Sequence, residues 1–404
     1  MEILECAKKI KENGGNLYLV GGAVRDKFLG IEPHDKDYCV TGVTQEEFEV
    51  LFDNAYKRGK NFCVYDIDGV EFALARKEIK SGQKHTDFEV EVGKKITIEE
   101  DLSRRDVTIN SIAIDVLTNE IIDPFNGIKD IENRIIRATS NAFSDDPLRV
   151  YRVAVLAARY NFEIEQETLK LMKSLKDDLK HLSGERVLGE LKKALNCDKP
   201  SIFFEVLKKA DCLQEHFKEI YDLIGVEQPV KYHPEGDAFN HTIEVVDRCA
   251  SATPILKIRF CALVHDLGKA LTPKSNWPHH YNHERLGVAS INSLCKRLCV
   301  SNDWRKSAIT ACTEHMLGGK YYELKNSTKV DFFERVHRSL LGLQGLEIIV
   351  NADKHPDTKI EFAKIGEDVI KNINGKEMSN IKDYNVLKEK VRAKRIEYLK
   401  KQYT

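Results

Sequence analysis

The uneven distribution of strand-like segments along the chain constrains its fold more than any other feature of the sequence. Short apolar and β-branched runs typical of strands occur at residues 16–20, 38–40, 63–67, 70–75 and 109–116. From about Asp145 onward such runs nearly vanish, and apolar residues recur at helical spacing in residues 148–159, 167–179 and 185–195. We therefore predict an α+β fold, with a small mixed sheet in the first third and an all-α remainder.

The composition excludes several classes of protein. A chain of 404 residues that is 42% hydrophobic can bury sizeable cores, so it is not a disordered chain. No run approaches the ~20 apolar residues that cross a bilayer, and the charged, amphipathic N-terminus is unlike a signal peptide. Ten cysteines without a CxxC spacing fit a reducing cytoplasm.

Net charge is uninformative about a nucleic-acid partner, because it is −1 over the whole chain. Residues 381–404 differ, with eight Lys and Arg against three Asp and Glu. Such a segment suits either a phosphate backbone or the solvated face of a terminal helix.

A glycine pair separates the first predicted strand from a predicted helix at residues 23–29. At Gly21-Gly22 the backbone N–H groups can approach a phosphate, and the following helix adds the positive end of its dipole. Arg25 stands one turn into that helix, within reach of the same anion. Taken alone, a glycine pair is typical of an ordinary tight turn.

Two aspartates follow the glycine pair. If Asp35 and Asp37 belong to one strand with the apolar residues 38–40, their side chains project to the same side. Paired carboxylates suit Mg²⁺, which prefers carboxylates plus substrate phosphates and supports phosphoryl transfer. Taken alone, this pattern also fits a solvated turn.

These motifs resemble those of the polymerase-β-like nucleotidyltransferases, and more narrowly the CCA-adding tRNA nucleotidyltransferases of bacteria and eukaryotes. The resemblance covers nearly the first half of the chain in order. It rests on GGAVRDKFLG (21–30), DKDYCVTG (35–42), EFALAR (71–76), DLSRRDVTINSIAID (101–115), IIDPFNGIKDIENRIIR (121–137), DDPLRVYRVAVLAARY (145–160) and LSGERVLGEL (182–191).

The resemblance implies roles for the residues of the glycine turn and the carboxylates. Gly22 and Arg25 would hold the incoming triphosphate. Asp35 and Asp37 would be catalytic and bind Mg²⁺, and we expect Glu71 to be a third carboxylate of the site.

Nucleotide contacts are also implied further along the chain. Arg105 matches the family's nucleotide contact, and Asp146, Arg149 and Arg152 lie near one face of a predicted helix. In the family, this acidic residue and arginine act as an amino-acid template that selects C and A. An ordinary salt-bridged helix face is the alternative.

Two positions depart from the family's pattern in that template segment. Asp145 stands where the family has Glu, which shortens the side chain by one carbon. Val155 stands where related bacterial enzymes often carry Arg, so that contact is absent or supplied elsewhere.

The second half of the chain contains most of the histidines. His265-Asp266 ends an apolar segment, and together with His241 and Asp353 it offers imidazole nitrogens and carboxylate oxygens that suit a divalent metal. This ordered set resembles the HD phosphohydrolase superfamily, in which the four positions ligate metal, here Ni²⁺ or Mg²⁺. We expect supporting or phosphate-contacting roles for His280, His283 and His315.

The predicted organisation combines both resemblances. It consists of a nucleotidyltransferase head, a helical neck and body, an HD domain and a basic helical tail, at residues 1–140, 141–228, 229–360 and 361–404. The Pro- and Gly-containing residues 225–236 are the expected linker.

The combination predicts a multifunctional CCA-adding enzyme. Its expected partners are tRNA, CTP and ATP, without a membrane, and it is expected to act as a monomer or homodimer. The HD domain would hydrolyse 2′,3′-cyclic phosphates and 2′-phosphates. Alternatives are a poly(A) polymerase, an enzyme adding only A or only CC, a tRNA-binding protein with an inactive head, and a hydrolase of free nucleotides.

Overall fold

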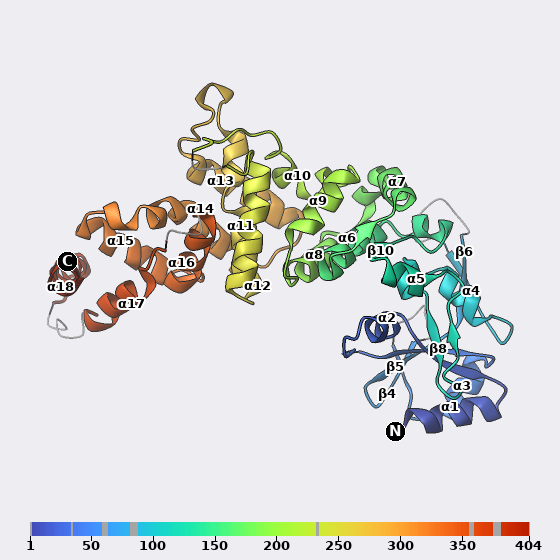
Figure 1. Ribbon diagram of the computed structural model, residues 1–404. Helices are drawn as coiled ribbons and strands as arrows, with labels where there is room; N and C mark the ends of the chain where they lie inside the picture. The colour runs from blue at the N-terminus through green and yellow to red at the C-terminus, as the bar shows by residue number, and fades with distance from the viewer. Residues whose placement is uncertain are drawn as a thin grey trace. The chain divides into compact units, whose positions relative to one another are not determined.

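The computed structural model of the chain comprises two compact units, Met1–Leu179 and Lys180–Thr404 (Figure 1). The structure describes residues 2–33, 35–58, 64–80, 88–231, 234–354, 359–374 and 381–403. Nine of the ten cysteines lie in these ranges, and these nine are free thiols. No described helix has the length and apolar character needed to cross a bilayer.

The first unit is built on a seven-stranded mixed sheet with strand order β3-β4-β5-β2-β1-β8-β9. The strands of this sheet are β1 (Asn16–Val20), β2 (Asp37–Thr41), β3 (Tyr56–Arg58), β4 (Val64–Ile67), β5 (Val70–Leu74), β8 (Ala113–Asp115) and β9 (Ile121–Ile122). Two smaller sheets pair β6 (Arg76–Lys80) with β7 (Phe88–Val92), and β10 (Ile135–Ile136) with β11 (Glu163–Ile164). The central strand β2 runs antiparallel to β1 and parallel to β5.

The helices of the first unit are α1 (Ile3–Glu12), α2 (Gly22–Phe28), α3 (Gln45–Leu51), α4 (Ile98–Ser103), α5 (Gly127–Glu132), α6 (Leu148–Tyr160) and α7 (Gln166–Ser174). Of these, α1 and α2 pack against β1 of the large sheet, whereas α6 packs against β10 of a smaller one (Figure 1). Both α3 and α4 begin with a capping box, in which a threonine and the glutamate three residues later satisfy each other's backbone N–H groups. The apolar face of α1 packs with Phe48 of α3 and Phe72 of β5 into one core.

Most of the predicted elements of this unit are confirmed, including those at residues 1–13, 16–20, 23–29 and 148–159. The prediction that Asp35 and Asp37 share a strand is wrong. The last residue of β1, Val20, pairs with Asp37, and the chain then turns into α2. No residue of β1 therefore remains to pair with Asp35, which lies in a bend before β2.

Two other predicted segments are shorter than expected. Within residues 109–116 only β8 is a strand, and Thr108–Asn110 form a 3₁₀ helix. Within residues 167–179 the α-helix ends at Ser174, and a 3₁₀ helix follows at Lys176–His181. The predicted strand at 63–67 is β4, although Cys63 lies outside the described residues.

In the second unit the described residues form helices and connecting loops, with one isolated β-bridge between Glu227 and Asp237. Its helices are α8 (Gly184–Leu195), α9 (Ser201–Lys209), α10 (Gln214–Tyr221), α11 (Ala238–Ala252), α12 (Leu256–Val264), α13 (His283–Arg297), α14 (Asn302–Gly319), α15 (Asn326–His337), α16 (Gly342–Asp353), α17 (Ala363–Asn372) and α18 (Tyr384–Tyr403). The expected linker lies between α10 and α11.

The helix α12 is the centre of this unit. Its residues from Ile258 to Val264 are all buried, and it packs against α8, α11, α14 and α16. The guanidinium group of the buried Arg259 donates hydrogen bonds to four backbone oxygens, those of Leu195, Cys197, Ala250 and Thr253. These bonds satisfy carbonyl groups near the ends of α8 and α11, so the position of α12 is determined by both neighbours.

Candidate active sites

The turn between β1 and α2 brings Gly22 and Arg25 together. Gly21 has φ +72° and ψ −138°, a conformation that side chains disfavour, and the turn therefore needs glycine. A Cβ atom on Gly22 would lie 3.2 Å from Arg25 Nη2, so the guanidinium group rests against this glycine. Arg25 is buried, donates to Asp26 Oδ1 at 2.9 Å, and lies 4.6 Å from the centre of the Tyr160 ring.

Asp37 lies at the start of β2, beside Glu71 on β5, since the two residues are partners in the parallel ladder. Burial raises the pKa of Asp37, and the charge of Asp35 raises it further, against the opposing effect of Arg105. Burial and then the charge of Asp37 raise the pKa of Glu71. The carboxylates of Asp35, Asp37 and Glu71 therefore lie close enough to affect one another's ionisation. Hard oxygen donors grouped in this way fit Mg²⁺.

The buried carboxylate of Asp101 positions two arginines at the end of α4. It accepts hydrogen bonds from Arg104 Nη2 at 2.6 Å and from Arg105 Nη2 at 3.0 Å. Burial raises the pKa of Asp101, but these two guanidinium groups lower it on balance. Arg105 Nη1 reaches the glycine turn, since it lies 3.1 Å from where a Cβ of Gly21 would stand. Sequence reasoning missed Asp101, although its spacing to both arginines on a helix was a usable signal.

Two of the predicted template residues, Arg149 and Arg152, donate hydrogen bonds to the segment that contains Arg104 and Asp106. Arg149 donates to the backbone oxygens of Ala142 at 2.5 Å and Arg104 at 2.6 Å. Arg152 Nε donates to the buried Asp106 at 2.7 Å. Asp146, however, is not in α6 as predicted, because it has an extended backbone (φ −126°, ψ 107°) and its Oδ1 accepts from Leu148 N.

The position of Asp146 outside the helix has a local cause. Pro147 follows it, and a residue before proline is driven out of the helical region by a clash with the proline ring. Val155, where relatives often carry Arg, is buried in α6, so this side chain supplies no polar contact.

The ion pair of Asp106 with Arg152 predicts a pH-dependent contribution to stability. Burial opposes ionisation, but Arg152 and Asn110 lower the pKa of Asp106 to about 2, below its ordinary value of 3.8. The pair therefore stabilises the fold fully above pH ~4 and loses this effect as the pH falls toward 2. At neutral pH, Arg152→Ala should lower the free energy of unfolding by about 2 kcal/mol.

Urea denaturation followed by circular dichroism, at neutral pH and near pH 3, measures this effect. The difference between wild type and Arg152→Ala should shrink at the lower pH. Lys170→Ala removes an exposed ion pair with Glu167 and should change stability little at either pH. A pH-independent loss in Arg152→Ala would contradict the assignment.

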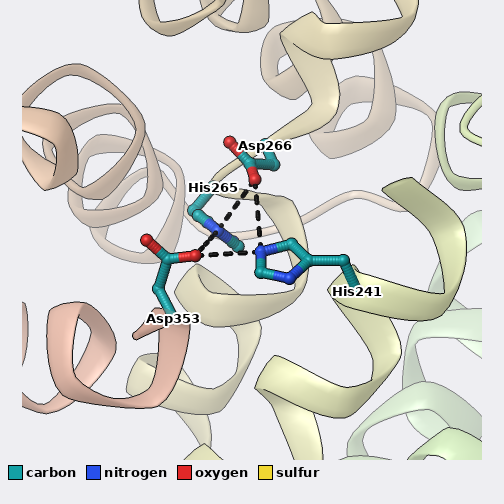
Figure 2. Close-up of side chains that lie close together, drawn as sticks. All are labelled: His241, His265, Asp266 and Asp353. Atoms are coloured by element: carbon teal, nitrogen blue, oxygen red, sulfur yellow. Dashed lines mark hydrogen bonds and ion pairs between the residues drawn. The ribbon is translucent and has the colours of Figure 1, made fainter. Parts of the chain in front are cut away.

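In the second unit, the four residues predicted from sequence as metal ligands converge (Figure 2). His241 comes from α11, His265 and Asp266 follow α12 directly, and Asp353 is the last residue of α16. His241 Nε2 lies 2.9 Å from Asp353 Oδ1, and His265 Nε2 lies 3.2 Å from Asp266 Oδ2. One ligand atom from each of the four residues lies within 4.8 Å of the others.

The surroundings of both histidines direct their Nε2 atoms to the centre of this cluster. His265 Nδ1 lies 2.7 Å from the backbone oxygen of Ala262, which can only accept, so Nδ1 carries the proton. His241 Nδ1 contacts the carboxylate of Glu235 in the same way. His265 Nε2 is buried and has no hydrogen-bond partner among the described residues. This donor set fits a divalent metal, and Glu235 orients the ring of His241 through its Nδ1 atom.

The electrostatics of the cluster agree with a cation site. Burial lowers the pKa of His265, but Asp266 and Asp353 outweigh it and raise the pKa to about 10. Despite burial, the neighbouring histidines hold the pKa of both aspartates well below the usual range. The cluster thus concentrates negative charge that attracts a cation.

The three further histidines that we expected near the metal do not behave alike. His283 Nε2 and His315 Nε2 lie 3.1 Å and 3.4 Å from Asp266 Oδ1. His280 instead uses both ring nitrogens elsewhere, with Thr272 Oγ1 and the backbone oxygen of Glu227. The structure brings His283 and His315 to the cluster, while His280 lies at its margin.

A cavity of about 900 Å³ opens onto the cluster and is lined by Asp266 and Asp353. Lysines also line it, namely Lys231, Lys269, Lys320 and Lys354. Lys269 is buried, and its Nζ lies 2.6 Å from Asp266 Oδ2. A negatively charged site surrounded by ammonium groups suits a metal ion together with a phosphate. Sequence reasoning missed Glu235, which lies in the expected linker and has no periodic signal.

The fold and the two sites define a nucleotidyltransferase head followed by an HD domain. Three family models match in that order: the poly A polymerase head domain at residues 17–137, the probable RNA and SrmB- binding site of polymerase A at 161–223, and the HD domain at 238–352.

Curated relatives identify the family more narrowly. A multifunctional CCA protein of Haemophilus influenzae (strain PittGG) is 46% identical over 333 residues, which are 79% of each chain. One of Pseudoalteromonas atlantica is 44% identical over 326 residues, which are 79% of this chain and 80% of the relative. The chain belongs to the family of multifunctional CCA proteins and is an enzyme of the nucleotidyltransferase class.

Solved structures share the fold at low sequence identity. A Thermotoga maritima CCA-adding enzyme complexed with tRNA has a TM-score of 0.69 and 20% identity, over 98% of this chain and 90% of the other. A CCA-adding enzyme complexed with ATP has a TM-score of 0.66 and 21% identity over the same shares.

Proposed function

We propose that the chain adds and repairs the 3′-terminal CCA of tRNA, using CTP and ATP and releasing pyrophosphate. The observation that carries this proposal is the meeting of Asp37, Glu71 and Arg105 beside the glycine turn. Membership of the multifunctional CCA protein family supports it, as do similar structures described with tRNA, ATP and CTP.

In the proposed reaction, the 3′-hydroxyl of tRNA attacks the α-phosphorus of the nucleotide, and pyrophosphate leaves. Asp35 and Asp37 would hold Mg²⁺, which when bound would make the attacking hydroxyl more acidic and neutralise charge on the phosphates. Gly22, Arg25 and Arg105 hold the triphosphate in line. The buried ion pair of Arg25 with Asp26 keeps its guanidinium group in place for this role.

We also propose that residues of α6 and the segment before it select the base. Asp146 offers an acceptor, and Arg149 offers donors next to the segment that contains Arg104 and Arg105. Together they can read the edges of C and A as a nucleic-acid base would.

For the HD domain we propose metal-dependent phosphohydrolysis of 2′,3′-cyclic phosphates, 2′-phosphates and phosphomonoesters. Ni²⁺ or Mg²⁺ bound to the four-residue cluster would supply an activated water. The lysines of the cavity would hold the phosphate. Trimming a damaged tRNA end before CCA is rebuilt would join the two activities in the cytoplasm.

A second candidate for the head is a poly(A) polymerase or an enzyme that adds only A or only CC. It is favoured by the match of residues 17–137 to a poly A polymerase head. The two candidates differ in the nucleotides incorporated and in the number added.

The two activities should be separable by mutation, since the carboxylates and the histidines lie in different units. Asp35→Ala combined with Asp37→Ala should abolish nucleotide addition and leave hydrolysis of a 2′,3′-cyclic nucleotide unchanged. His265→Ala should do the reverse. Loss of both activities in either variant, with the fold confirmed by circular dichroism, would refute the two-site proposal.

Base selection should depend on Arg149. Arg149→Ala should relax discrimination against UTP and GTP by about ten- to a hundredfold, the factor that follows from ~1–3 kcal/mol for a good bidentate base contact. The measurement is kcat/KM for all four nucleotides on tRNA that lacks CCA.

Comparing the four nucleotides distinguishes a role of Arg149 in base selection from a purely structural role. Because Arg149 also donates to the carbonyls of Ala142 and Arg104, its loss should slow all four nucleotides. Only a role in selection changes the ratios between them. Arg149→Lys keeps the positive charge but removes the planar guanidinium group that can donate two parallel hydrogen bonds, and it should also relax selection. An equal loss for all four nucleotides would show that Arg149 is structural.

A further inference from the structure

The segment between α12 and α13 presents two aromatic side chains to solvent. The rings of His279 and Tyr281 are stacked, with their centres 6.0 Å apart and their planes 28° apart. Tyr281 is 68% exposed, so its ring contributes little to the packing of the fold. Both residues line the cavity that opens onto the HD cluster. We call this pair the aromatic platform.

The residue between the two, His280, holds the platform in place. Its Nδ1 lies 2.7 Å from Thr272 Oγ1, and its Nε2 lies 2.8 Å from the backbone oxygen of Glu227. Its own backbone oxygen lies 2.7 Å from His283 Nδ1, at the start of α13. The platform is therefore positioned before any ligand binds, which reduces the entropic cost of binding.

The cavity is far larger than a phosphate group requires. Its volume of about 900 Å³ is typical of sites that enclose a whole small-molecule ligand. The buried residues Asp266 and Lys269 give it a charged lining. Apolar lining comes from Pro229, Pro234, Pro278 and Met316. A phosphate bound at the cluster therefore leaves room and apolar surface for the group that carries it.

The positive charge of the cavity also exceeds what one phosphate needs. Lys269 Nζ lies 2.6 Å from Asp266 Oδ2, next to the place of that phosphate. Three more lysines line the cavity, namely Lys231, Lys320 and Lys354. Additional ammonium groups suit additional phosphates. Aromatic rings combined with ammonium groups are the means by which proteins bind single-stranded nucleic acids.

We propose that this cavity binds the 3′ end of a single-stranded RNA, with the terminal base stacked on Tyr281 and the preceding phosphates beside the three lysines. The terminal 2′,3′-cyclic phosphate or 2′-phosphate then lies at the HD cluster. This proposal deepens the proposed phosphohydrolase function of the same domain and rests on it. Because stacking tolerates every base, all four bases are accepted at the end.

Substrates with and without a base test the role of the platform. The full-length chain, loaded with Ni²⁺ or Mg²⁺, is given adenosine 2′,3′-cyclic phosphate or 1-O-methylribose 2,3-cyclic phosphate, which has no base. Tyr281→Ala should lower the ratio of the two kcat/KM values by about ten- to a hundredfold, as expected for loss of base stacking. Tyr281→Phe keeps the ring and should preserve the ratio. Tyr384→Ala is the matched control, because Tyr384 of α18 is equally exposed, at 69%, and lies outside the cavity lining.

Binding is measured separately from hydrolysis. The probe is a trinucleotide that ends in 2-aminopurine with free 2′ and 3′ hydroxyls, which the hydrolase cannot cleave. In the presence of Mg²⁺, stacking on Tyr281 should quench its fluorescence. Tyr281 lies in the second unit, so quenching that is lost in Tyr281→Ala comes from this cavity and not from the head.

Adding upstream nucleotides tests whether the ligand is an RNA end. A trinucleotide that ends in a 2′,3′-cyclic phosphate should have a kcat/KM about tenfold above that of the cyclic mononucleotide, and the gain should shrink as ionic strength rises. Lys320→Ala should reduce this gain.

The outcomes separate this proposal from the proposed function. If the wild type hydrolyses these substrates, the phosphohydrolase function stands. In that case, an unchanged ratio in Tyr281→Ala, or equal kcat/KM values for the mononucleotide and the trinucleotide, overturns the RNA-end site alone. Quenching that depends on Tyr281, without hydrolysis of any substrate, supports the site and overturns the hydrolytic function. The absence of both overturns both.

Discussion

Buried carboxylates determine the geometry of both sites, because each must be neutralised by nearby cationic or hydrogen-donating groups. In the head, Asp101 and Asp106 are almost inaccessible to water, and each is paired with arginine. In the second unit, Asp266 is surrounded by histidine rings and the ammonium group of Lys269. An unpaired buried charge costs much free energy, so removing one partner of such a pair would destabilise the protein. The side chains around each carboxylate therefore have little freedom to move.

In the head, this constraint connects the glycine turn, proposed to bind phosphate, with the arginines of α6 that are proposed to select the base. One short segment, Arg104 to Asp106, supplies a guanidinium group to the glycine turn and binds Arg149 and Arg152 of α6. A nucleotide held by its triphosphate and read by its base would therefore contact parts of one rigid network. Such rigidity is what a template made of side chains requires, since it has no complementary strand to correct a misplaced base.

The sequence was sufficient to predict the elements with strong periodicity and the four residues that converge in the HD cluster. It was not sufficient where pairing between distant segments decides the outcome. Asp35 falls outside β2 because β1 ends at Val20, a limit imposed by the turn into α2. Asp146 leaves the helix for a local reason, the following Pro147, which the sequence already contained. The contacts of Glu235 with His241 and of Asp266 Oδ1 with His283 join segments that are apart in the chain. No local sequence pattern indicates either contact.

The central claim is that the head builds the sequence CCA on tRNA without a nucleic-acid template. The most direct measurement is to incubate the purified chain with tRNA that lacks CCA and with all four nucleoside triphosphates together, and to sequence the 3′ ends of the products. The account predicts that the ends are extended by C, C and A in that order and that addition then stops. A run of A residues, incorporation of U or G, or ends that stop after CC or after a single A would contradict it.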